Sequence, residues 1–126
     1  MTDFLGTINI EYNRTMNHAS SPTRCVVQRD LPALFSIIAT EMMDVAIVES
    51  SVEYALRVGL FKDNSYQCSF VDRQLIKKLL NQFKELNLVY SSWSDSTSKL
   101  YWGLTAKGKR VRNEMILAKN PSQIVK

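Results

Sequence analysis

Residue types that carry catalysis or bind metals are scarce in this chain. Its 126 residues include a single histidine, His18, and only two cysteines, Cys25 and Cys68. No carboxylate pair, nucleophile–base set, glycine-rich phosphate loop or cysteine–histidine cluster with metal spacing stands out. We therefore expect no enzymatic activity, no cofactor and no metal site.

The chain also lacks a long apolar run and a secretory signal. Its longest apolar stretch, Val45 to Val48, is far too short to cross a bilayer and is flanked by acids. The first residues lack the basic and then apolar progression of a signal peptide. Cys25 and Cys68 could form a disulfide, but two free thiols in a reducing cytosol are the favoured interpretation. The sequence thus predicts a cytoplasmic protein with no membrane partner.

Positive charge is concentrated in the second half of the chain. Residues 1–60 carry four basic and seven acidic side chains, a net charge of −3, whereas residues 61–126 carry twelve and five, a net charge of +7. Halves of opposite charge indicate that one half meets a polyanion while the other does something else. Lysine and arginine side chains that merely solvate helices would give the same count.

The length suffices for one domain with one modest core. Residues 1–28 are polar and weakly periodic; Ile8, Ile10 and Tyr12 alternate with polar residues as in a short strand, and residues 17–23 read as a loop. We expect residues 1–28 to be a partly ordered arm whose order depends on a partner. We expect one domain over residues 29–119 and a C-terminal tail over residues 120–126.

A first helix is predicted after Asp30, a typical N-cap, with Pro32 in the first turn. Apolar residues recur at helical spacing from Leu31 to Val45, and others up to Val48 fill most of the remaining circumference. A helix that is apolar nearly all round must be covered on more than one side. It is either central to its own core or covered in part by a second subunit, and we favour a homodimer.

A second helix is predicted from its cap and its end. Ser50 or Ser51 can cap it, and Gly59 is typical of a C-terminal stop. The polar residues 62–65 then form a turn.

A third helix is expected over about residues 70–86. Ser69, followed three residues later by Asp72, resembles a capping box that opens it. A clear apolar stripe faces the core, and Asn87 can take the left-handed conformation that ends the helix.

A two-stranded hairpin is predicted next. The aromatic-rich runs 88–93 and 99–104 flank a polar, serine-rich turn. Leu100, Trp102 and Leu104 alternate onto one face, which we expect to be the core face.

A last helix is expected over roughly residues 106–118, capped by Thr105 and ended by Asn120 and Pro121. Its apolar residues would face inward or towards a partner. Its first turns carry a second basic group, which could contact flanking phosphates or keep the surface soluble: Lys107, Lys109, Arg110 and Arg112.

The order helix, helix, capped helix, hairpin, helix is that of a winged helix-turn-helix, a mostly helical α+β fold with a two-stranded wing. Residues 79–89, LLNQFKELNLV, resemble the end of a recognition helix that runs into its wing. Residues 104–108, LTAKG, match the L-T-x-K-G that follows the second wing strand. On these two segments the chain resembles MarR-like and PadR-like bacterial regulators over about residues 69–118.

The chain departs from this pattern in places, so no subfamily is assigned. Thr97 stands where the family often has a wing-tip arginine that reaches the minor groove, and Asn87 replaces the usual glycine before the wing. The final helix is shorter than the long dimerisation helix of MarR-like proteins, and the segment between Val45 and Cys68 aligns poorly.

The resemblance implies binding to double-stranded DNA, with the third helix in the major groove. Arg73 and Gln74 are candidates for guanine and adenine edges, and Ser69 with the free N–H groups at the helix start for a phosphate. Lysines would neutralise backbone charge. The full set of candidate DNA-binding residues is Ser69, Arg73, Gln74, Lys77, Lys78, Asn81 and Lys99.

Other functions stay open. The chain could be a partition or replication accessory DNA-binding protein of a plasmid or phage, or a protein-interaction winged helix that uses Trp93, Tyr101 and the first helix. Stacking of single strands on Tyr90, Trp93 and Tyr101 is a third class. A small-molecule effector is conceivable, although no pocket can be read from the sequence.

Overall fold

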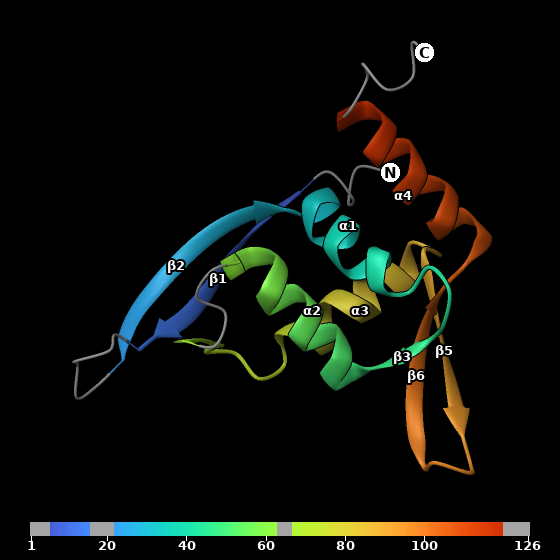
Figure 1. Ribbon diagram of the computed structural model, residues 1–126, viewed down its shortest axis with the longest axis horizontal. Coiled ribbons are helices and arrows are strands. Elements are labelled where there is room, and N and C mark those ends of the chain that lie inside the picture. Colours follow the sequence, from blue (N-terminus) through green and yellow to red (C-terminus); the bar gives the residue numbers. More distant parts are fainter. Residues whose placement is uncertain (1–5, 16–21, 63–66, 120–126) are drawn as a thin grey trace.

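The computed structural model of the chain describes residues 6–15, 22–62 and 67–119. Its helices and strands form two antiparallel three-stranded sheets, in the strand orders β2–β1–β4 and β3–β6–β5, with four helices (Figure 1). In chain order the elements are β1 (Thr7–Arg14), β2 (Thr23–Asp30), α1 (Leu31–Glu41), β3 (Ile47–Val48), α2 (Glu49–Phe61), β4 (Cys68–Phe70), α3 (Leu75–Glu85), β5 (Val89–Ser94), β6 (Lys99–Leu104) and α4 (Ala106–Lys119).

The helices α1, α2 and α3 together with the sheet β3–β6–β5 make a winged helix-turn-helix. β5 and β6 pair from Val89 opposite Leu104 to Ser94 opposite Lys99, which gives the two-stranded wing. The short strand β3 closes the sheet on the other side of β6. The fold class expected from the sequence, a mostly helical α+β winged helix, is confirmed.

The start of α1 agrees with the prediction, but its end does not. The carboxylate of Asp30 accepts a hydrogen bond from the backbone N–H of Ala33 at 3.3 Å, as an N-cap does. The helix ends at Glu41, whereas the periodicity predicted helix through Val48. Residues Ile47 and Val48 pair with β6 instead, because β-branched side chains suit a strand and a partner strand is available.

The apolar circumference of α1 is covered largely by its own chain. Leu34, Phe35 and Ile38 are fully buried, and the edge of the Phe35 ring meets Phe83 of α3 with centroids 5.2 Å apart. Helices α2 and α4 flank α1 (Figure 1). Most of the covering surface that the sequence ascribed to a second subunit therefore comes from within the chain.

Two expectations for α2 are wrong. The helix begins at Glu49 after the N-cap Val48, whose apolar side chain makes no capping hydrogen bond. Neither Ser50 nor Ser51 caps the helix, because both lie within it. Gly59 lies inside α2, which continues to Phe61. A Cβ at Gly59 would lie 2.6 Å from Cγ2 of Ile37, so the glycine allows α1 and α2 to approach closely rather than ending the helix.

The N-terminal region is more regular than the expected arm. β1 and β2 pair over their full length, from Thr7 opposite Asp30 to Arg14 opposite Thr23, and β4 pairs with the end of β1. Ile10 is 1% exposed and belongs to the core. These strands are held by pairing within the chain and by core packing. Residues 17–21 of the predicted loop, which include His18, lie outside the described residues.

The boundaries of α3 also need correction. Ser69 lies in β4, so it does not open a capping box, because β4 pairs with β1 there. α3 runs from Leu75 to Glu85, shorter than the predicted 70–86. At its other end Asn87 has φ 61°, the left-handed conformation expected of it.

Both cysteines are free, as predicted, with Cys25 half-buried and Cys68 buried. They lie on β2 and β4, on either side of β1 and offset by two residues along it, so their Cα atoms are more than two strand spacings, or about 10 Å, apart and beyond disulfide reach. Burial raises the pKa of the Cys68 thiol. None of the helices within the described ranges is long and apolar enough to span a membrane.

Candidate nucleic-acid interface

The helix α3 is sharply divided into a buried and an exposed face. Leu75, Ile76, Leu79, Leu80 and Phe83 are buried in the core. The opposite face is polar and exposed. All seven candidate DNA-binding residues are exposed: Ser69, Arg73, Gln74, Lys77, Lys78, Asn81 and Lys99.

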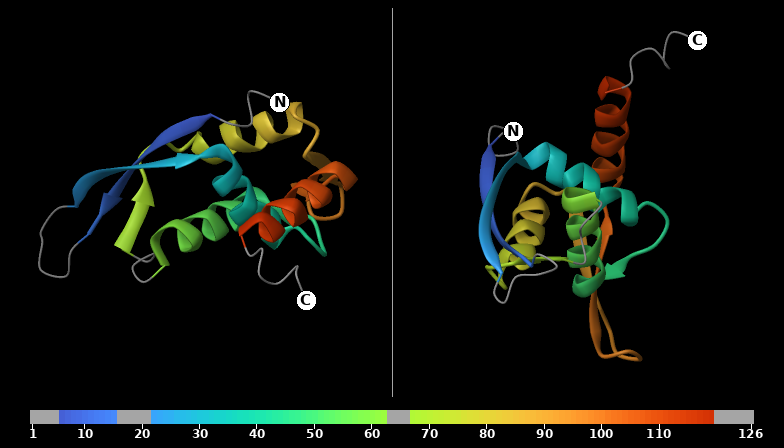
Figure 2. Two further views of the ribbon diagram at one scale, coloured as in Figure 1. Left: turned by 90° about the horizontal axis from the view of Figure 1, so that it is seen from above. Right: turned by 60° about the vertical axis from the view of Figure 1, so that its left-hand side comes forward.

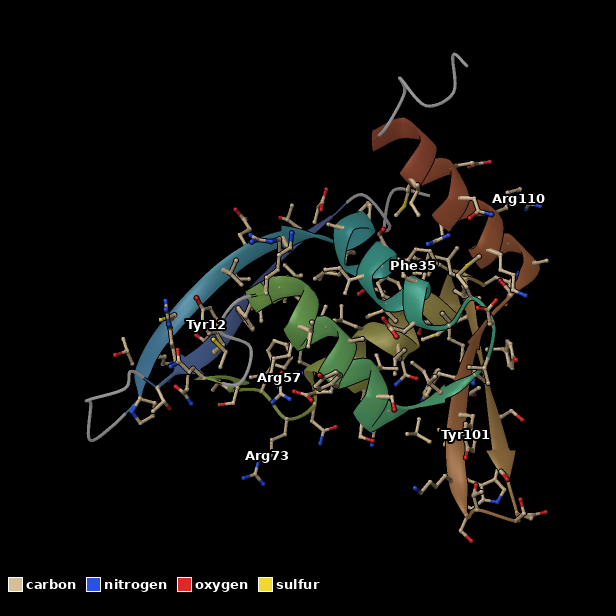
Figure 3. All side chains as sticks on the ribbon, in the orientation of Figure 1. Tyr12, Phe35, Arg57, Arg73, Tyr101 and Arg110 are labelled. Atoms are coloured by element: carbon tan, nitrogen blue, oxygen red, sulfur yellow. The ribbon has the colours of Figure 1, made fainter. Side chains whose placement is uncertain are left out.

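Asp72 organises the start of α3. Its carboxylate accepts hydrogen bonds from the backbone N–H of Gln74 at 2.8 Å and from Nζ of Lys78 at 3.0 Å. These two bonds hold the pKa of Asp72 below its usual range. Arg73 and Gln74 therefore lie in the turn that leads into α3. In Figure 3 the Arg73 side chain extends away from the body of the molecule, on the side towards which the wing also projects.

A groove separates α3 from the wing. We call it the wing groove; it has a volume of about 340 Å³ and also touches the first residues of α2. Lys77 lines it from α3, and Lys99 from the wing. The apolar Trp93, Leu100 and Trp102 also line it, and around the start of α2 it includes the acidic Glu49. The remaining lining residues are Val48, Ser50 and Ser98.

A second groove, of about 890 Å³, runs along the other edge of α3. We call it the strand groove, because Gly6 and Thr7 at the start of β1 form its far wall. Lys78, Asn81 and Glu85 line it from α3. The exposed face of α3 is thus a ridge with a groove on each side, and each groove contains at least one lysine of the candidate set.

The wing extends well beyond the helices (Figure 2). Trp102 and Leu104 are buried on its core face, as predicted, but Leu100 is 41% exposed. Leu100 shares that face with them and lies farther from the base of the wing, where the helices no longer cover it. At the tip Ser98 has φ 53°, a left-handed conformation that closes the turn.

The end of α3 is tied to the start of α4. Thr105 caps α4 as predicted, since its Oγ1 accepts from the N–H of Gly108 at 2.9 Å, and it also donates to the carbonyl of Asn87 at 2.6 Å. Nζ of Lys107 donates to the carbonyl of Leu86 at 3.1 Å. Lys107, which the sequence grouped with cations able to reach phosphates, therefore binds the last turn of α3 instead.

The joint between α3 and α4 requires a glycine at position 108. A Cβ there would lie 2.0 Å from the carbonyl oxygen of Leu88, closer than any side chain can approach. The segment 104–108 thus fixes the position of α3 through a cap, a lysine and a close backbone contact.

Solved structures that resemble this chain include variants of ZitR from Lactococcus lactis. One matches with a TM-score of 0.49 at 17% identity over 76% of this chain and 59% of that chain. Another matches with a TM-score of 0.47 at 15% identity over 73% and 55%. This chain spans a little over half the length of those proteins. No family model matches it, and no curated protein matches it.

Several residues that shape the site were outside the sequence-based set. Nζ of Lys84 donates to Oγ of Ser91 at 2.8 Å and lies 6.0 Å from the centre of the Trp102 ring, so it ties α3 to the wing. The only feature of the sequence that pointed to Lys84 was its place on the polar face of α3. Leu100 was expected in the core and instead lines the wing groove. Within residues 6–15, 22–62 and 67–119 no three metal-ligating side chains come together.

Proposed function

We propose that this chain is a double-stranded DNA-binding winged-helix protein that acts as a dimeric transcriptional regulator. One observation carries the proposal: the polar face of α3 is an exposed ridge with a lysine-bearing groove on each side. This relief matches a helix in the major groove of DNA, where a phosphate strand runs along each side of the inserted helix.

The residues of the ridge then take distinct roles. Arg73 and Gln74, in the turn before α3, are placed to reach base edges, because the start of a recognition helix enters the groove most deeply. Lys77 and Lys99 would bind phosphates in the wing groove, and Lys78 in the strand groove. Glu85 repels phosphate, so the DNA backbone would pass the strand groove near Lys78, whose Nζ would exchange its bond to Asp72 for one to a phosphate.

A dimer is part of the proposal because one recognition helix covers few base pairs. Two copies of α3 would read half-sites about 10 base pairs apart, and each correctly read base would add to the specificity. Sedimentation velocity over a range of protein concentrations, with and without a duplex, tests the assembly. A particle of one chain on a minimal bound duplex would contradict it.

Duplex binding is tested by fluorescence anisotropy on random and selected duplexes over a series of salt concentrations. We expect tight binding at low salt that weakens steeply as salt rises. Arg73→Ala should lose its preference for selected over random duplex, whereas Arg110→Ala, an exposed arginine on α4, should keep it. No binding at low salt would contradict the proposal and favour a protein partner, and stronger binding to single strands would also contradict it.

Selection of bound genomic fragments tests the regulatory part of the proposal. Single sites upstream of genes are the expected result. Arrays of repeats beside a replication origin would contradict regulation and point to a partition or replication accessory role.

A further inference from the structure

The last lysine of α3 differs from the other lysines of that helix. Lys77 and Lys78 each line a groove beside α3, whereas Lys84 lines neither groove. Nζ of Lys84 donates to Oγ of Ser91 on β5 at 2.8 Å and lies 6.0 Å from the centre of the Trp102 ring on β6. Lys84 is thus directed towards both strands of the wing rather than into the surfaces proposed to hold phosphates.

The bond between Lys84 and Ser91 lies where α3 and the wing diverge. Lys77 is two helical turns before Lys84, or about 10 Å along the same face of α3. Three residues beyond Ser91, Ser94 pairs with Lys99, so Lys99 lies about 10 Å farther out along the wing. The two lysines of the wing groove are therefore at the ends of two arms of similar length that diverge from this bond.

The charges of the wing groove make the angle between these arms important. Lys77 and Lys99 line the groove, but Glu49 lines it too, and Asp95 is bonded to Nε1 of Trp93, another lining residue. A phosphate is held there only if it lies nearer to the lysines than to the carboxylates, because the Coulomb energy falls with distance. The place of Lys99, which moves with the wing, therefore decides whether the groove can hold a phosphate.

We propose that Lys84 is a positioning residue whose bond to Ser91 sets the angle between α3 and the wing. That angle then fixes where Lys99 lies relative to Lys77 when duplex DNA is bound. The inference rests on the proposed function and adds that Lys84 acts through Lys99 rather than by touching DNA. Trp102 supports the same role, because a cation over an aromatic ring is attracted to it and this ring belongs to the wing.

Ser91→Ala tests this role without removing a charge. The variant leaves Lys84 without its acceptor on the wing, and we expect about a tenfold loss of duplex affinity, the order that one hydrogen bond to a charged group contributes. Ser92→Ala is the matched control, because Ser92 is exposed on the opposite face of the same strand, and it should bind as the parent does. If Lys84 instead held a phosphate itself, Lys84→Met would weaken binding and Ser91→Ala would not, which would refute the proposal.

A double-mutant cycle tests whether the effect passes through Lys99. Lys99→Met should weaken binding clearly less in the Ser91→Ala protein than in the parent, because the displaced wing has already lost most of that contact. Lys78→Met, in the strand groove at the other edge of α3, should cost the same in both proteins. Additive losses for Ser91→Ala and Lys99→Met would contradict the proposal, even if Ser91→Ala alone weakened binding.

The angle of the wing can also be measured without DNA. Residual dipolar couplings of backbone amides should show α3 and the wing in one orientation in the parent and in Ser92→Ala, and in a changed or averaged orientation in Ser91→Ala. An unchanged orientation in Ser91→Ala would refute the proposal while the proposed function stands. A parent that binds no duplex would refute the proposed function, whereas the couplings would still decide whether the bond sets the angle.

Discussion

Gly108 is a single residue on which the position of α3 depends. Gly108→Ala would push a methyl group into the Leu88 carbonyl oxygen, 2.0 Å from the ideal Cβ, and backbone at such a joint cannot move freely. We expect a loss of about 3 kcal/mol in the free energy of unfolding, the upper end for overpacking. Urea denaturation measures it.

Gly103→Ala is the matched control for Gly108→Ala. The Cβ added at Gly103 would meet the far end of the Tyr90 ring at 2.6 Å, and that exposed ring can turn away. The loss should be clearly smaller than at Gly108. Equal losses for the two variants would contradict the close backbone contact as the reason for the glycine.

The lowered pKa of Asp72, at the start of α3, predicts that the free energy of unfolding depends on pH. Its pKa is lower in the folded chain than in the unfolded chain, first because of the Gln74 N–H and then because of Lys78. Its contribution to stability is therefore present above the unfolded pKa and is lost as the pH falls through the folded pKa.

The check is the free energy of unfolding measured from neutral to acidic pH for the parent and for Asp72→Asn. The parent should lose more stability than the variant on acidification, with the difference arising below the ordinary pKa of an aspartate. Parallel curves for the two proteins would contradict the role given to Asp72.

At the scale of elements, the joint between α3 and α4 rests on Lys107. Lys107→Met keeps the length of the side chain but leaves the Leu86 carbonyl without its donor. We expect a loss of about 1 kcal/mol, the low end for a buried acceptor left unsatisfied, because this bond is only partly buried. Lys109→Met, an exposed neighbour on α4, should change the unfolding midpoint little, and an equal effect of both variants would speak against the joint.

Local signals predicted the elements whose ends are decided locally. Asp30, Asn87 and Thr105 each act through bonds or backbone angles within their own turns, and all three were identified correctly. The misassigned segments depend on distant strands. In the sequence Ile47 and Val48 continue the helical pattern, but in the fold they pair with β6. Ser69 resembles a helix cap in the sequence, but in the fold it pairs with β1.

The candidate site divides in the same way. Exposure of Lys77, Lys78 and Asn81 follows from the amphipathic pattern of one helix, which a sequence shows directly. The wing groove arises only when α3, the wing and the start of α2 are placed together. No local pattern distinguishes Leu100, which protrudes, from Trp102, which does not, because they occupy equivalent positions of one alternation.

At the scale of the whole molecule, charge should govern the strength of DNA binding. Lys77→Met and Lys78→Met each remove one proposed phosphate contact per subunit and therefore two per dimer, so each should reduce the magnitude of the slope of log K against log salt by about 1.8. Lys109→Met, on α4, should leave the slope unchanged. An unchanged slope in both α3 variants would show that the two grooves do not hold the DNA backbone.

The central claim is that α3 and the turn before it occupy the major groove, and methylation protection at guanine N7 tests it most directly, because N7 lies in that groove. On a selected fragment the account predicts protected guanines in two clusters about one helical turn apart, with protection lost in Arg73→Ala and kept in Arg110→Ala. Bound DNA whose guanine N7 atoms remain fully reactive, or protection that is unchanged in Arg73→Ala, would contradict it.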